Sequence, residues 1–278
     1  MMMKTLKRAP KAYNNIPFLN NPSARTIRIL AEYLEPMKRF QKEKIVDTIV
    51  FFGSARILPG KIASKTLEIT KRKLLNNNDK TKITNQLLED ALIDVEMSKY
   101  YDEAVELAFL LTKWSNNLDK ERRFVICSGG GPGIMEAANR GALKAKGKSI
   151  GLNISLPHEQ SPNPYITKEL NFEFHYFFMR KLWFMYLAKA MVMFPGGFGT
   201  IDEMMEVLTL VQTKKTTKHL PVILYGQEYW DKVLNFKNLI KYHTISKADM
   251  KLFTFANSPG EAFEYLKKDL TKFHLQKK

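Results

Sequence analysis

The sequence predicts an α/β protein built on a Rossmann-like, doubly wound parallel sheet of about six or seven strands, with an added N-terminal helical region. Short apolar runs alternate along the chain with segments of helical periodicity, which is the pattern of parallel strands joined by helices. Three of these runs lead into turns of small residues, at the edge where such sheets bind ligands. The predicted strands are Thr48–Phe52, Phe124–Cys127, Ser149–Ile154, Phe172–Phe177, Ala190–Phe194 and Pro221–Tyr225.

The N-terminal region, residues 1–44, is predicted to lie outside the sheet domain. Residues 1–22 have little periodicity and three prolines, so an extended arm is expected there. Apolar residues then recur at helical spacing from about Ala24. Pro36 is expected to kink or end this helix, because proline removes a backbone donor.

Residues 45–278 are predicted to form one nucleotide-binding domain that carries an insertion. The insertion, residues 60–98, is rich in Lys, Asn and Asp and has helical spacing on both sides of an asparagine-rich loop, so it should be charged and mostly helical. Amphipathic helical segments are expected to finish the chain. Helices are predicted over Tyr100–Trp114, from Gly133 to about Lys146, and over Met179–Lys189 and Glu203–Thr213.

Composition excludes several classes of protein. The single cysteine, Cys127, cannot form an internal disulfide and suits a reducing, cytoplasmic location. No apolar run approaches the ~20 residues that span a bilayer, so no membrane association is expected. The five histidines lack metal-ligand spacing, and no metal is expected.

The net charge of +16 raises the possibility of nucleic-acid binding. The positive charge is spread over both tails and over helix faces, without a compact stripe of arginine and aromatic residues. We therefore prefer a lysine-rich, solvated surface to a nucleic-acid interface. A positive field would also attract a phosphorylated small substrate.

Two glycine loops carry the main functional signal. Gly129–Gly133 follows one predicted strand, and the loop after Ala190–Phe194 occupies the same place after another. A glycine turn that opens a helix presents free N–H groups and a positive dipole end to phosphate; a tight packing turn is the alternative. Candidate phosphate-binding residues, including the small-residue turn after Thr48–Phe52, are Gly53, Ser54, Gly130, Gly131, Gly133, Gly196, Gly197, Gly199 and Thr200.

The loops do not match the common dinucleotide and triphosphate motifs. In G-x-G-x-x-G the third position after Gly131 would be glycine, but it is Ile134. The motif also needs an acidic residue about 20 positions further along the chain to bind the ribose 2′-hydroxyl, and none is found there. A P-loop ending in Gly147-Lys148-Ser149 would need glycine at position 142, which is alanine. The ligand is therefore expected to be a mononucleotide.

Glu203 and Arg180 each have a structural and a functional interpretation. Thr200 and Glu203 have the spacing of a capping box, in which the glutamate bonds back to the N-cap. Alternatively, Glu203 faces a bound sugar, where it could stabilise an oxocarbenium-like ribose or orient a water molecule. Arg180 is either a solvated helix-surface residue or a fixed guanidinium for phosphate or ribose, to which Lys181 would add a point charge.

These residues carry a resemblance to a known family. Pro195-Gly-Gly-Phe-Gly-Thr200 with Glu203, and Met179-Arg-Lys181 upstream, resemble the Lonely Guy family of cytokinin riboside 5′-monophosphate phosphoribohydrolases, long mislabelled as lysine decarboxylases. Residues 129–141 and 156–164 resemble its longer bacterial branch. The resemblance covers roughly residues 45–58 and 100–230.

The resemblance implies hydrolysis of the N-glycosidic bond of a nucleoside 5′-monophosphate, such as AMP or a cytokinin ribotide, to free base and ribose 5-phosphate. It implies that Arg180 and Glu203 form the catalytic pair, and that Gly197 to Thr200 hold phosphate and ribose. Thr209 matches a substrate contact of the family, and Glu159 is a further candidate. The family also implies a homo-oligomer, a dimer or larger.

Two other functions fit the same residues. A non-catalytic nucleotide or cofactor carrier would use the phosphate loops alone, since a fold does not determine function. A single-stranded nucleic-acid-binding protein would use the basic charge, although the aromatic residues lie mainly at core spacing. No cofactor is expected, because no lysine lies in a convincing context for the Schiff base that a pyridoxal phosphate decarboxylase needs.

Overall fold

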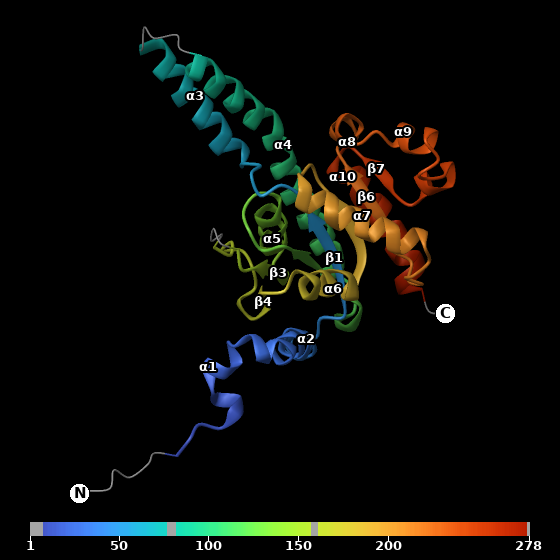
Figure 1. The fold of residues 1–278 in the computed structure, drawn as a ribbon. Helices are drawn as coiled ribbons and strands as arrows, with labels where there is room; N and C mark the ends of the chain where they lie inside the picture. Colours follow the sequence, from blue (N-terminus) through green and yellow to red (C-terminus); the bar gives the residue numbers. More distant parts are fainter. Residues whose placement is uncertain (1–7, 77–81, 157–160, 277–278) are drawn as a thin grey trace, which may run out of the picture.

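The computed structural model describes residues 8–76, 82–156 and 161–276, and its centre is a seven-stranded parallel sheet (Figure 1). The spatial order of the strands is β4-β3-β2-β1-β5-β6-β7, and every neighbouring pair is parallel. The predicted fold class is therefore confirmed. The strands are β1 Asp47–Phe52, β2 Phe124–Ser128, β3 Ser149–Ile154, β4 Asn171–Phe174, β5 Ala188–Met193, β6 Val222–Tyr225 and β7 Thr254–Ala256.

Helices cover both faces of the sheet. The α-helices are α1 Ile16–Leu19, α2 Arg25–Lys42, α3 Gly60–Asn76, α4 Lys82–Asn116, α5 Ile134–Lys144, α6 Phe177–Leu187, α7 Phe198–Gln212, α8 Gln227–Val233, α9 Phe236–Lys241 and α10 Pro259–Leu270. None of the helices in the described residues combines the length and apolar character that a bilayer crossing requires.

The central strand β1 shows how the two cores form. Successive side chains of a strand point to opposite faces. Val50 and Phe52 enter a core shared with α2, α6, α7 and α8, and Ile49 and Phe51 enter a second core shared with α4, α5 and α10. A strand that is buried on both faces needs an uninterrupted apolar run, which explains its sequence.

Several element boundaries differ from the prediction. The helix predicted to extend to Lys189 ends at Leu187, and Lys189 lies in β5, where its ammonium group pairs with the Asp47 carboxylate at 3.1 Å. The strand β4 ends at Phe174, before Phe177. The strand β7 lies in the segment predicted to be helical; with only three residues, it is too short for a period to be recognised.

The N-terminal region also corrects the prediction. Residues 8–22 include short helical turns and α1 rather than a fully extended arm. The helix α2 continues past Pro36, because the turn that follows is held by tertiary packing. Phe40 lies there, with its ring 4.8 Å from that of Phe172 and 5.2 Å from that of Trp183.

The predicted insertion forms a two-helix hairpin that projects from the body of the molecule (Figure 1). The helix α3 packs against the first half of α4. Residues Tyr100–Trp114 are helical as predicted, but the helix begins earlier, because α4 runs without a break for 35 residues. It contains neither glycine nor proline, so nothing in its sequence interrupts the helix on the way from the projection into the body.

Candidate active site

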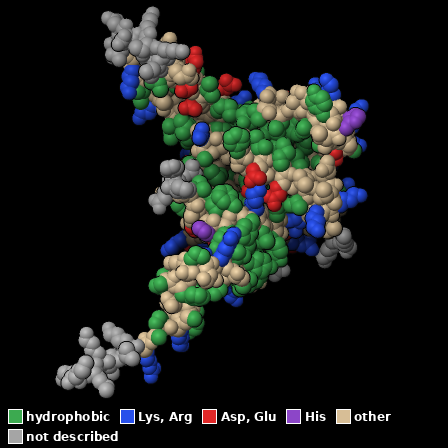
Figure 2. All heavy atoms as spheres, viewed as in Figure 1, with side chains coloured by type: hydrophobic (Ala, Val, Ile, Leu, Met, Phe, Trp, Pro, Cys, Tyr) green, Lys and Arg blue, Asp and Glu red, His purple; other side chains and the backbone are tan. Residues whose placement is uncertain are grey.

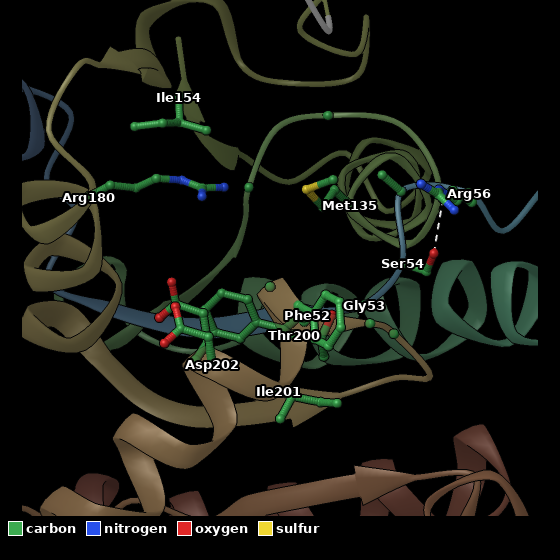
Figure 3. Close-up of a pocket in the computed structure, with 18 of the residues that line it drawn as sticks. Phe52, Gly53, Ser54, Arg56, Met135, Ile154, Arg180, Thr200, Ile201 and Asp202 are labelled. Atoms are coloured by element: carbon green, nitrogen blue, oxygen red, sulfur yellow. Dashed lines mark hydrogen bonds between the residues drawn. The ribbon is translucent and has the colours of Figure 1, made fainter. Parts of the chain in front are cut away.

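A pocket of about 680 Å³ opens at the carboxyl edge of the sheet. The loops after β1, β2, β3 and β5 meet there, as expected where a doubly wound sheet changes direction. Figure 3 shows residues from these loops and from α6 and α7 around the pocket. Nine of the residues predicted from the sequence line it: Gly53, Ser54, Gly131, Arg180, Gly196, Gly197, Gly199, Thr200 and Glu203.

The turn after β1 connects the two glycine loops. The Ser54 N–H donates to the Pro195 carbonyl at 2.9 Å, and the Ser54 carbonyl accepts from the Ile134 N–H at 3.1 Å. The Ser54 hydroxyl accepts from the Arg56 N–H at 3.1 Å (Figure 3). The backbone donor of Ser54 is therefore already used, and this turn holds the walls of the pocket in place.

Packing within the protein explains two of the predicted glycines. Gly130 and Gly133 have positive φ angles, 79° and 67°, which other residues rarely adopt. A Cβ at Gly133 would also collide with the Ser54 carbonyl, and one at Gly130 with the Asn153 side chain. Neither glycine is among the residues that line the pocket.

Gly197 and Gly199 differ from those two glycines. A Cβ at either position would meet no protein atom within 4 Å, and neither residue has a positive φ angle. The N–H groups of Phe198 and Gly199, in the first turn of α7, have no acceptor among the described residues. This helix start therefore presents free donors to open space, which is the geometry of an anion site.

The interpretation of Thr200 and Glu203 as a capping box is wrong. The helix α7 begins at Phe198 and its N-cap is Gly197, so Thr200 lies inside the first turn and Glu203 lies further along the helix. The Glu203 side chain makes no hydrogen bond within the described residues, although the residue is only 8% exposed. Capping of the start of α7 therefore does not explain why a carboxylate is buried at this position.

The surroundings of Glu203 suit acid–base chemistry. Burial raises the pKa of Glu203 from 4.5 to about 7, and the positive charges of Lys181 and Arg180 oppose this shift. Near neutral pH both the protonated and the ionised form are populated. A carboxyl group with a pKa close to the working pH can donate or accept a proton efficiently.

Arg180 extends from α6 into the pocket (Figure 3). Its Nε donates to the Leu152 carbonyl at 2.7 Å, and its guanidinium lies 5.1 Å from the centre of the Phe184 ring. A Cβ at Gly129 would lie 2.5 Å from Nη2, so that glycine makes room for the guanidinium. Burial lowers the pKa of Arg180 and the Glu203 charge opposes this. The guanidinium is fixed rather than solvated, and it remains cationic.

Two other predicted residues do not line the pocket. The Lys181 ammonium pairs with the carboxylates of Asp202 and Glu206, each at 2.8 Å, and Lys181 does not line the pocket. Thr209 is exposed and donates to the Met205 carbonyl at 2.7 Å, again away from the lining. Glu159 lies outside the described residues.

The pocket also contains residues that the sequence did not identify as functional. Arg56 and Asn153 line it, and the Tyr229 hydroxyl donates to the Gly196 carbonyl at 3.0 Å. Arg56 directly follows the Gly53–Ala55 turn, and Asn153 is a polar residue in a buried strand; both signals were present in the sequence. Tyr229 comes from α8 and had no such signal. Within the described residues, no group of three or more His, Cys, Asp or Glu side chains could hold a metal ion.

Comparison with known proteins gives one family match and several distant structures. A family model described as "possible lysine decarboxylase" matches residues 135–266. No curated protein matches the chain.

Among solved structures, the structural genomics target TM1055 is 19% identical, with 80% of this chain and 99% of that chain covered and a TM-score of 0.47. Two structures of a molybdenum cofactor carrier protein from Chlamydomonas reinhardtii are each 16% identical. They cover 81% of this chain and 98% or 99% of theirs, with TM-scores of 0.40 and 0.43. These likenesses are too distant to bear on function.

Proposed function

We propose that this protein hydrolyses the N-glycosidic bond of nucleoside 5′-monophosphates, releasing a free base and ribose 5-phosphate. The observation that carries the proposal is the combination, in one pocket, of an open anion site at Gly197 and Gly199 with a buried carboxyl group at Glu203. The Lonely Guy resemblance supports the same activity, and the matched family's description agrees with the older label of that family.

In the proposed reaction the 5′-phosphate accepts hydrogen bonds from the N–H groups at the start of α7. The ribose then lies near Glu203, further along the same helix. Cleavage of the bond from C1′ to the base nitrogen leaves positive charge on the ribose, which a carboxylate stabilises. Water adds to C1′ and gives a proton to the ionised Glu203, the leaving base takes up a proton from solvent, and Glu203 then returns its proton to solvent. Arg180 holds ribose or phosphate oxygens through its free guanidinium nitrogens.

Two alternative functions, a carrier and a decarboxylase, account for fewer features of the pocket. A nucleotide or cofactor carrier needs the anion site, but it has no use for a buried carboxylate. A pyridoxal phosphate decarboxylase needs a lysine beside its cofactor, and no lysine is among the described residues that line the pocket.

The direct test is a chromatographic screen of nucleoside 5′-monophosphates for released base. The wild-type protein should release base from at least one of them. Glu203→Gln and Arg180→Ala should each lose at least about a hundredfold in kcat, the usual contribution of a group that transfers a proton or stabilises charge. Wild-type rates in either variant would refute the assigned role, and ligand binding without turnover by the wild-type protein would favour the carrier.

A matched pair of alanine substitutions tests the anion site separately from the chemistry. Gly199 and Gly260 are both the second residue of their helices, α7 and α10, and a Cβ at either would meet no protein atom within 4 Å. Both substitutions should therefore leave stability unchanged or raise it by about 0.5–1 kcal/mol. Only Gly199→Ala should weaken binding of nucleoside monophosphate in calorimetry, because its methyl group occupies the place of the phosphate. Equal affinity in both variants would exclude phosphate binding at this loop.

We also propose that the protein forms a homo-oligomer through the helices beside the pocket. Phe177, Phe178, Leu182 and Tyr186 of α6 are exposed, and Phe198, at the start of α7, is 95% exposed. Figure 2 shows broad hydrophobic areas around acidic and basic side chains near the middle of this view. Contiguous apolar surface of this kind usually marks an interface.

A further inference from the structure

Asn139, Asn153 and Asn163 are buried side chains around the glycine loop that follows β2. A buried side-chain amide normally has partners for both its nitrogen and its oxygen. Asn139 follows this rule. Its nitrogen donates to the Ile150 carbonyl at 3.1 Å, and its oxygen accepts from the Ser128 hydroxyl at 2.7 Å.

Asn163 holds the glycine loop with both ends of its amide. Its nitrogen donates to the Gly130 and Gly131 carbonyls at 3.0 and 3.1 Å, and its oxygen accepts from the Tyr165 N–H at 3.1 Å. The amides of Asn139 and Asn163 are therefore both accounted for by the structure of the loop.

Asn153, near the end of β3, differs from the other two asparagines. Its nitrogen donates to the side-chain oxygen of Asn171 at 2.7 Å and to the Phe172 carbonyl at 2.9 Å, both on β4. Because a backbone carbonyl can only accept, these bonds identify the nitrogen and hold the amide in one orientation. Among the described residues, no group donates a hydrogen bond to the oxygen of this amide.

The free oxygen of Asn153 faces the pocket. Asn153 lines the pocket although only 5% of the residue is exposed. A Cβ at Gly130 would collide with this oxygen, so the glycine leaves it uncovered. The Arg180 guanidinium lies nearby, because its Nε donates to the carbonyl of Leu152, the residue before Asn153. The pocket wall therefore offers a fixed hydrogen-bond acceptor near a group of donors.

An acceptor in this position restricts how a nucleotide can bind. Phosphate oxygens are acceptors as well and gain nothing from Asn153, so the phosphate lies elsewhere, at the free N–H groups that begin α7. The group beside Asn153 must be a donor. A nucleoside 5′-monophosphate has two kinds of donor: the ribose hydroxyls, and the amino group of bases such as adenine.

We propose that Asn153 determines specificity in this pocket, because its Oδ1 accepts a hydrogen bond from a ribose hydroxyl or a base amino group. The inference rests on the nucleotide site of the proposed function. A ligand that lacks the donor leaves this oxygen unpaired. Sites that are built to bond a hydroxyl or an amino group reject such a ligand more strongly than a hydrophobic pocket rejects a change of size.

Calorimetry of the full chain with AMP and three analogues tests the proposal. The analogues 2′-deoxy-AMP and 3′-deoxy-AMP each lack one hydroxyl, and IMP has a carbonyl in place of the amino group. The wild-type protein should bind at least one analogue about tenfold more weakly than AMP, and the analogue that it rejects identifies the donor. Equal affinity for all four nucleotides would overturn the proposal.

Variants assign the discrimination to Asn153. In Asn153→Ala, AMP and the rejected analogue should bind with the same affinity, because the acceptor is gone. Asn153→Leu, of similar size, takes its place if circular dichroism melting shows that the alanine variant does not fold. Asn171→Ala is the matched control: it removes a partner of the Asn153 nitrogen, on an exposed residue outside the pocket lining, and should keep the wild-type discrimination. Discrimination that persists without the Asn153 oxygen would refute the assignment.

The outcomes separate this inference from the proposed hydrolysis. Discrimination that depends on Asn153, without release of base, would support the inference and refute the hydrolase. Release of base with equal discrimination in wild type and in the Asn153 variants would support the hydrolase and remove Asn153 from recognition. No binding of any of the four nucleotides would overturn the inference, whatever the screen for released base shows.

Discussion

Replacing Glu203 by glutamine should slow the proposed hydrolysis at least about a hundredfold and yet stabilise the protein at neutral and alkaline pH. Burial raises the pKa of Glu203 from 4.5 to about 7 in the folded protein, while the unfolded chain keeps an ordinary value. The folded state therefore binds more protons than the unfolded state between these two pH values. The free energy of unfolding must then fall as the pH rises through this window.

The size of the effect follows from the shift. A change in pKa from 4.5 to about 7 corresponds to about 3 kcal/mol. Glu203 is only 8% exposed, so screening by solvent reduces this energy only slightly. Glutamine carries no charge at any pH. The difference in unfolding free energy between Glu203→Gln and wild type should therefore grow by about 3 kcal/mol from below pH 4.5 to above pH 7.

Urea denaturation followed by circular dichroism, at pH steps between about 4.5 and 8, measures this difference. Glu264→Gln is the matched control, because that side chain lies on α10 and is 69% exposed, so its replacement should alter the free energy of unfolding little at any of these pH values. A stability difference for Glu203→Gln that is the same at both ends of the range would refute the assignment of a buried, pH-sensitive carboxyl group.

Three further predictions concern α6. Arg180→Lys keeps the charge but loses the planar set of donors, so kcat should fall at least about tenfold while the melting temperature is retained; a wild-type rate would remove the guanidinium from the mechanism. Lys181→Met removes a positive charge that lowers the pKa of Glu203, so the limb of the pH–rate profile that belongs to Glu203 should move to higher pH, and an unchanged profile would contradict this. Leu182→Asp places a charge on the exposed apolar face of α6 and should convert the proposed oligomer into smaller species in light scattering; an unchanged mass would place the interface elsewhere.

The sequence predicts the structure well where a structural element requires one type of residue. Strands covered on both faces must be apolar, and six of the seven strands were recognised for that reason. The glycine loops were identified because they follow such strands. Gly130 and Gly197 nevertheless look alike in the sequence. Only the backbone angles and neighbouring atoms show that the first is required by packing, whereas the second faces open space.

The sequence was misleading where a local pattern competed with tertiary structure. Thr200 and Glu203 have the spacing of a capping box, but the preceding loop allows α7 to begin at Phe198, which places both residues inside the helix. Lys181 adjoins Arg180 in the sequence and was predicted to share its role. Neighbouring residues of a helix point about 100° apart, and Lys181 instead reaches Asp202 and Glu206 on α7.

The proposed hydrolase and the alternative carrier make different demands on Glu203. Arg180 and Lys181 supply positive charge nearby, yet burial still raises the pKa of Glu203, so the ionised form destabilises the folded protein. The carboxylate does not cap α7 and makes no hydrogen bond within the described residues. A glutamine of nearly the same shape would fill the same space without that penalty. Catalytic groups are often ones that destabilise the fold in their charged form and line a ligand pocket, as Glu203 does. A carrier that only binds its ligand would not need such a group.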